Sequence, residues 1–84
     1  MPDYFIVTIT NASGSFEVDL EIPSFVKFAK MKGKLLEILK IMDGREFGGW
    51  RDYSLSHKNR PIAAGETLSD VGAFDGSRLV ATRI

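Results

Sequence analysis

The strongest constraint on the fold is a change of hydrophobic period at Pro23. Before this proline, apolar residues alternate with acidic ones from residue 16 to residue 22, as in a strand with one covered and one solvated face. After it, apolar residues recur every three or four positions, which is typical of a helix with one buried side. Because proline cannot donate to a paired strand, the sequence predicts that a strand ends here and a helix follows.

The helix is predicted over residues 24–43. Ser24 is expected to cap its first turn, and Gly44 is expected to close it in a left-handed conformation. Lys32 falls at the margin of the apolar side and is expected to lay its stem along Leu36. The apolar side is predicted to comprise Phe28, Met31, Leu35, Ile38, Leu39 and Met42. The solvated side carries Lys27, Lys30, Lys34 and Glu37.

Strands are expected on both sides of this helix. Residues 4–10 are β-branched and aromatic, and a turn over 11–14 joins them to the alternating segment as a hairpin. A loop is predicted over 45–49 and a third strand over 50–56, followed by a tight reversal over 57–60.

The end of the chain has its own signals. Thr67 and Asp70 have the spacing of reciprocal caps on a short turn, which Gly72 is expected to end. A turn over 75–76 then leads into a last strand with Leu79 and Ala81 toward the core. The element order predicts an α+β fold, with a mixed four- to five-stranded sheet and one helix packed across it. We expect a single domain over residues 1–84.

This order, with its motifs, resembles the ubiquitin-like β-grasp fold, and within it the YukD/EsaB-type ubiquitin-like proteins of bacterial type VII secretion. The segments that carry the resemblance are Thr8-Ile9-Thr10, Phe16 to Leu20, Lys34 to Leu39, Gly49-Trp50, Asn59-Arg60-Pro61, Leu68-Ser69-Asp70 and Gly76 to Leu79. The resemblance implies a non-enzymatic, cytoplasmic accessory or regulator of secretion that acts through protein contacts. It also implies that ubiquitin's apolar recruiting patch is mostly polar here.

Two alternatives remain open from the sequence. The chain ends at Arg83-Ile84 without the Gly-Gly tail that conjugation requires, so we expect it not to be conjugated. A covalent modifier or sulfur carrier stays possible if residue 84 is a boundary rather than the natural end. The other alternative is the ubiquitin-like domain of a larger, membrane-associated secretion protein.

Composition excludes several classes of function. Eleven basic and eleven acidic residues give a net charge of zero, which removes the long-range field on which nucleic-acid binders depend. The chain has no cysteine, hence no disulfide and no thiolate nucleophile, and this suits a reducing, cytoplasmic compartment. No apolar stretch is long enough to insert into a membrane. With one histidine and no cysteine, we expect neither a metal nor a cofactor.

Few residues suggest catalysis. His57 is either a proton shuttle or a solvated turn residue, and the second is favoured because no nucleophile or orienting partner accompanies it. The hairpin carboxylates are interpreted as a solvated face rather than as paired catalytic acids, because nothing predicts the burial that would raise a pKa. These carboxylates are Glu17, Asp19 and Glu21.

Other features are interpreted as structural. The glycines at 44, 48 and 49 follow a helix, whereas a phosphate loop precedes one, so a plain loop is favoured. The lysine stripe Lys27, Lys30 and Lys34 is interpreted as a wet helix face rather than a site for nucleic acid or lipid head groups. Trp50 either closes the edge of the core or anchors a partner, and the core is favoured.

The predicted partner surface is the sheet face that the helix leaves open. We expect a protein partner, from the secretion system, and a monomer or weak homodimer. The residues predicted to contact that partner are Ile6, Thr8, Ser54, Val80 and Thr82.

Overall fold

A computed structural model describes residues 3–84, so the first two residues of the predicted domain lie outside the described part. Five strands and two helices follow one another in the described chain. They are β1 (Tyr4–Asn11), β2 (Glu17–Pro23), α1 (Phe28–Met42), α2 (Gly44–Phe47), β3 (Tyr53–His57), β4 (Arg60–Pro61) and β5 (Arg78–Arg83).

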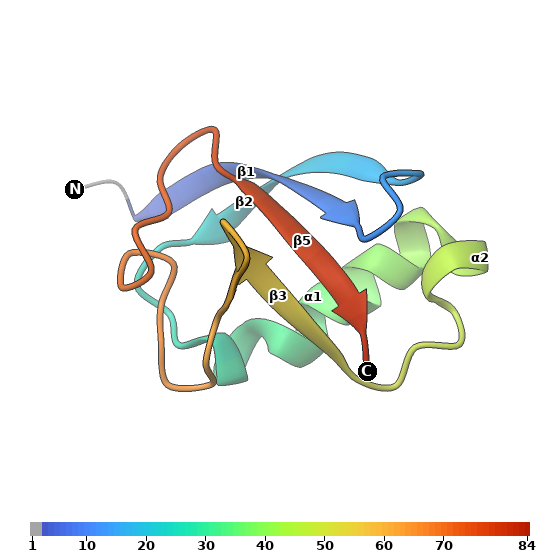
Figure 1. Cartoon of the computed structure of the whole chain (residues 1–84). Coiled ribbons are helices and arrows are strands. Elements are labelled where there is room, and N and C mark those ends of the chain that lie inside the picture. The colour runs from blue at the N-terminus through green and yellow to red at the C-terminus, as the bar shows by residue number, and fades with distance from the viewer. Residues whose placement is uncertain (1–2) are drawn as a thin grey trace.

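The strands form one mixed sheet in the order β2-β1-β5-β3-β4 (Figure 1). The hairpin β1–β2 is antiparallel, and β5 returns between β1 and β3, parallel to the first and antiparallel to the second. Helix α1 crosses behind the strands in Figure 1 and covers one sheet face. The predicted fold class, an α+β β-grasp with one helix across a mixed sheet, is confirmed.

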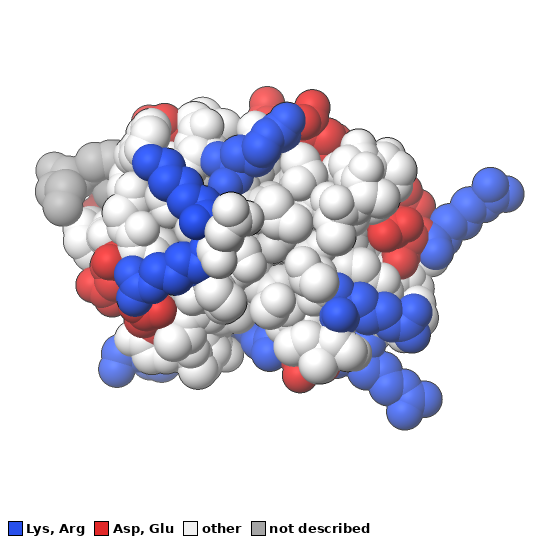
Figure 2. Space-filling view, viewed as in Figure 1, with Lys and Arg blue, Asp and Glu red and all other residues white. Residues whose placement is uncertain are grey.

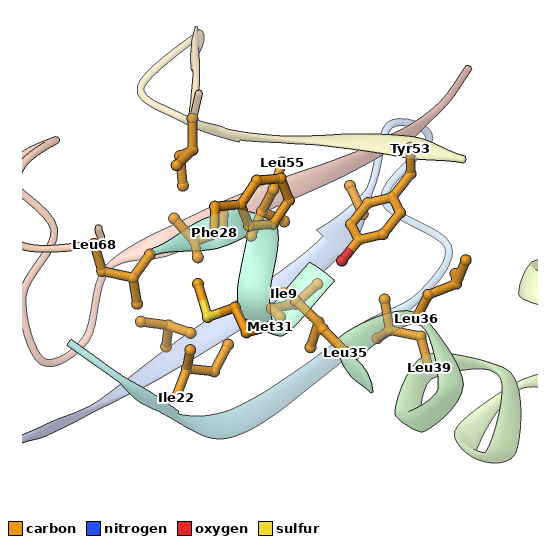
Figure 3. Packing of buried hydrophobic residues seen from close by; sticks show 14 of the residues in the cluster. Ile9, Ile22, Phe28, Met31, Leu35, Leu36, Leu39, Tyr53, Leu55 and Leu68 are labelled. Carbon is orange, nitrogen blue, oxygen red and sulfur yellow. The ribbon is translucent and has the colours of Figure 1, made fainter. Parts of the chain in front are cut away.

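The core lies between α1 and the covered sheet face. Each central strand directs every second residue into it, and Leu35 and Leu39 meet these residues from the helix (Figure 3). Leu68 reaches the same core from the loop before β5. Side chains with no exposed area include Val7, Ile9, Leu39, Leu55, Leu68, Leu79 and Ala81.

The predicted start of the helix is wrong. Helix α1 begins at Phe28, after the N-cap Lys27, whose side chain makes no cap hydrogen bond. The amides of Phe28 and Ala29 instead donate to the carbonyls of Glu66 and Ala64, at 2.8 and 3.0 Å. Ser24 is fully buried before the helix, and its carbonyl accepts from Ser69 N–H. A loop distant in sequence therefore satisfies the helix start, so a local cap is not needed.

The predicted loop over 45–49 and the left-handed Gly44 are also wrong. Gly44 opens the short helix α2, and the Asp43 side chain caps this helix by accepting from the amides of Arg45 and Glu46. The next glycine is needed for a different reason: a Cβ on Gly48 would lie 2.3 Å from the Gly44 carbonyl oxygen. The chain thus turns through one further helical turn before β3, which begins at Tyr53 rather than at residue 50.

The capped turn near the end of the chain is confirmed. Thr67 N–H donates to Asp70 Oδ2 at 2.9 Å, and Asp70 N–H donates to Thr67 Oγ1 at 3.1 Å. Gly72 follows with φ +79°, the left-handed region that favours glycine.

Candidate protein-interaction surface

The open sheet face carries all five residues predicted to contact a partner. Ser54 lies opposite Thr82, and Val80 lies between Thr10 of β1 and Ser56 of β3. Ile6 is half exposed, at 54%. It lies four residues from Thr10 along β1, about 13 Å at the usual rise of a strand. The register therefore brings Ser54, Val80 and Thr82 together and leaves Ile6 apart. Their role in binding stays a prediction.

Polar contacts connect the strands of this face. Thr8 Oγ1 donates to Asp19 Oδ1 at 2.6 Å, and Arg78 of β5 forms an ion pair with Glu17 of β2. Figure 2, viewed from the open side, shows a largely uncharged centre with charged side chains around it. Two of the three hairpin carboxylates are thus engaged at an exposed surface, where an ion pair contributes little stability.

Residues at one end of the open face were missed by sequence reasoning. Phe74 is 55% exposed and helps to line a hollow of about 380 Å³ beside Lys58 and Arg78. Lys58 and Asn59 both have positive φ in the turn before β4, which confirms the predicted reversal. The sequence signal for this hollow was Phe74 itself, an aromatic residue directly before the Asp75-Gly76 turn, at a position that was not predicted to lie in the core.

His57 is not the solvated turn residue that was predicted. It ends β3, is 5% exposed, and its Nδ1 lies 3.1 Å from the Val71 carbonyl oxygen. Because a carbonyl oxygen only accepts, Nδ1 carries the proton and donates. The side chain therefore links β3 to the loop before β5, an ordinary structural role for a buried histidine.

Trp50 belongs to the core, as predicted. It is 6% exposed and packs edge-on against Phe47 of α2, with ring centroids 4.7 Å apart. Phe16 meets the same Phe47 ring at 4.8 Å, so the aromatic cluster joins α2 to the hairpin. Trp50 therefore serves the core and leaves little surface with which to anchor a partner.

The two sides of α1 differ in how they meet the sheet. On the β3 side, Lys32 Nζ lies 2.6 Å from Asp52 Oδ1 and 5.7 Å from the centre of the Tyr53 ring. Tyr53 donates its hydroxyl to the Lys32 carbonyl at 2.8 Å. Lys32 and Leu36, which were expected to touch, line one hollow here. Side-chain contacts thus join this side of α1 to the sheet.

These contacts shift two pKa values. The hydrogen bond from Lys32, with a second from the Tyr53 amide, lowers the pKa of Asp52 below its ordinary 3.8. Burial raises the pKa of the Tyr53 phenol far above its ordinary 10.0, since the phenolate would lose its hydration. Both shifts have structural causes.

On the β2 side, an open apolar groove separates α1 from the strand. Ile38 and Met42, predicted as core, are 36% and 48% exposed. No strand covers them, because β2 is the edge strand of the sheet and no further strand lies beyond β2 within residues 3–84. Lys30 and Lys34, two of the three exposed lysines of the predicted stripe, line this groove.

The described residues hold no group of three or more His, Cys, Asp or Glu side chains that suits a metal ion. In the same part of the chain, neither helix has the length and apolar character that a membrane crossing requires.

The arrangement of the sheet and helix is that of the ubiquitin-like fold. Solved structures similar to it include the ubiquitin-like domain of the type VII secretion system protein ECCD1 from Mycobacterium tuberculosis. That structure is 22% identical, covers 98% of this chain and 99% of its own, and has a TM-score of 0.76. The EccD5 ubiquitin-like domain from Mycobacterium xenopi is 20% identical, with coverage of 99% and 97% and a TM-score of 0.79.

A third similar structure belongs to a larger assembly. A chain of the MycP5-free ESX-5 inner membrane complex matches at 21% identity and a TM-score of 0.79. The match covers 99% of this chain and 21% of that one, so the chain spans about a fifth of its length. No family model and no curated protein matches the sequence. The likeness therefore lies in the fold.

Proposed function

We propose that this chain is a ubiquitin-like interaction module of a type VII secretion system, which acts by non-covalent binding rather than by catalysis. The observation that carries the proposal is the likeness, over 97–99% of their length, to two ubiquitin-like domains of EccD proteins. Its cytoplasmic location follows from the same proposal. The burial of His57 and Trp50 supports it, since only 5% and 6% of these residues is exposed.

Two forms of this function differ in the length of the natural protein. One is a separate accessory or regulator of secretion, similar to the YukD/EsaB-type proteins. The other is a domain of a larger membrane-associated protein, and the neighbours favour this form, since one matched chain is about five times as long. An immunoblot of the native host with an antibody against this domain separates the two by apparent mass.

We place the partner contact on the open sheet face, at Ile6, Thr8, Ser54, Val80 and Thr82. Ile6 supports this placement because its side chain points away from the helix and is 54% exposed. A partner that covered this face would bury the Ile6 side chain, and burial of apolar surface favours association.

The experiment is affinity purification of the tagged protein from its host, followed by mass spectrometry. We expect a component of the secretion membrane complex to be enriched over a bait of the same fold, Caldiarchaeum subterraneum ubiquitin. Ile6→Lys combined with Val80→Lys is expected to lose that component while the thermal melt stays nearly unchanged. Equal recovery with both baits would contradict the proposed function.

The matched control is Phe25→Lys, which makes a similar apolar-to-basic change at a 52% exposed side chain in the loop before α1. It is expected to retain the partner. If Phe25→Lys loses the partner and the double variant keeps it, the contact lies at that loop and not on the open sheet face.

A further inference from the structure

The groove between β2 and α1 is an apolar feature that the proposed contact leaves unexplained. It has a volume of about 290 Å³. The strand supplies one wall and the helix the other. We call it the β2–α1 groove, and its lining residues are Glu21, Ile22, Pro23, Lys30, Met31, Lys34, Leu35 and Ile38.

The strand that forms one wall has a free backbone edge. On β1, Ile6 N–H donates to Asp75 and Ile6 C=O accepts from Gly76, so the Ile6 backbone points toward β5. The β2 residues opposite Ile6 and Thr8 are Glu21 and Asp19. In an antiparallel pair these are the non-hydrogen-bonded positions. The N–H and C=O groups of Asp19 and Glu21 therefore point outward, toward the side of β2 on which residues 3–84 place no strand.

An exposed apolar row on α1 continues the same wall. Ile38 follows Lys34 by four residues, and Met42 follows Ile38 by four, so all three lie on one side of the helix. Ile41, three residues after Ile38, is 84% exposed. This row is more apolar than a solvated helix side requires, and it reaches the groove at Ile38.

The acidic side chains of β2 restrict which strands can pair with this edge. Glu17, Asp19 and Glu21 point to the open sheet face, and Glu21 makes no ion pair or hydrogen bond through its side chain within residues 3–84. A second copy paired antiparallel through β2 would place these carboxylates against each other, and like charges directly opposite are destabilising. A strand with basic residues at those positions is favoured instead.

We propose that an extended segment of a partner protein adds to the sheet at β2, with apolar side chains in the β2–α1 groove and basic side chains opposite Glu21 and Asp19. Strand addition supplies main-chain hydrogen bonds, and alternate side chains supply specificity. The lysines of the α1 wall exclude basic side chains from the groove side, so apolar and basic residues must alternate. This proposal rests on the proposed function and adds a docking surface distinct from the open face.

The test uses two blocked synthetic peptides, Lys-Val-Lys-Ile-Lys-Val and Glu-Val-Glu-Ile-Glu-Val, titrated into the whole chain and followed by NMR. We expect the lysine peptide to bind about tenfold more tightly, since two or three cross-strand charge pairs change sign. The amides of Asp19 and Glu21 and the methyl groups of Met31, Leu35 and Ile38 should shift. Equal affinities, shifts confined to Ser54 and Val80, or no binding would overturn the proposal.

Two variants sharpen the result. Glu21→Lys should remove most of the preference for the lysine peptide, whereas Glu37→Lys, the same charge change on the exposed side of α1, should leave it intact. N-methylation of successive peptide residues should weaken binding at every second position, as strand pairing requires. A uniform effect of N-methylation would instead indicate non-specific charge attraction.

The outcome is separable from that of the proposed function. If the affinity purification recovers a secretion component and neither peptide binds at β2, the function stands and this docking surface is wrong. If the lysine peptide binds as expected and no secretion component is recovered, the surface stands and its partner lies outside the secretion system.

Discussion

The two sides of α1 face strands of the same sheet but meet them differently. Toward β3, the helix is joined to the sheet by the Lys32–Asp52 ion pair and by the Tyr53 hydroxyl. Toward β2, an apolar groove remains, and Ile38 is only partly covered. Helix α1 is therefore fixed to the sheet by core packing on its buried side and by polar contacts on the side toward β3. The other side carries the groove that we propose as a docking surface.

The largest effect is expected from the core beneath both sides. Leu35→Asp places a carboxylate at a core position that is 5% exposed and should unfold the domain. Lys30→Glu, one turn away on the exposed surface, should change the free energy of unfolding by about 0.5 kcal/mol or less. Thermal melts of the two variants measure this, and the reverse ranking would show that the helix register is wrong.

The next effect tests whether the β3 side stabilises the helix more than the β2 side. Tyr53→Phe removes the hydroxyl that donates to the Lys32 carbonyl and should lower the free energy of unfolding by about 1 kcal/mol. Ile41→Ser, on the exposed row of α1, should change it by less than about 0.5 kcal/mol. Urea denaturation of both variants gives the comparison. A larger loss for Ile41→Ser would place the stabilising contacts on the β2 side.

The smallest effect is a pH dependence confined to the β3 side. Because the pKa of Asp52 is lowered in the folded state, its contribution to stability is present above the unfolded value near 3.8. That contribution is lost as the pH falls through the folded value. Lys32→Met removes the main cause of the shift, so the variant should lose less stability than the wild type between about pH 4 and pH 2. The measurement is the free energy of unfolding of both proteins as a function of pH. An equal loss of stability in the two proteins would contradict Lys32 as the main cause of the lowered Asp52 pKa.

The accuracy of sequence prediction also differed between regions. Strands β1 and β2 were predicted within one residue, because strict alternation reports which side of a strand is covered. The reciprocal caps at Thr67 and Asp70 were predicted because their hydrogen bonds span three residues. The start of α1 and the course of residues 44–49 were predicted wrongly, since tertiary contacts or a short capped helix replaced the expected local signals.

The predicted binding residues show a similar division. Alternation placed Ile6, Thr8, Ser54, Val80 and Thr82 on one face, but their spacing across that face depends on strand register. Ser56, directly opposite Val80, was missed because the antiparallel register of β3 and β5 fixes that pairing. The β2–α1 groove was missed because the apolar period of α1 does not reveal where the sheet ends.

The sequence by itself determined the type and order of the main elements and the absence of cysteine chemistry, because period and composition are local properties. Only the tertiary structure decided that His57 is buried, that Lys32 pairs with Asp52, and that Ile38 and Met42 are left exposed. Each of these depends on which segment lies beside another. That is set by strand order and helix position, through contacts between residues far apart in the chain.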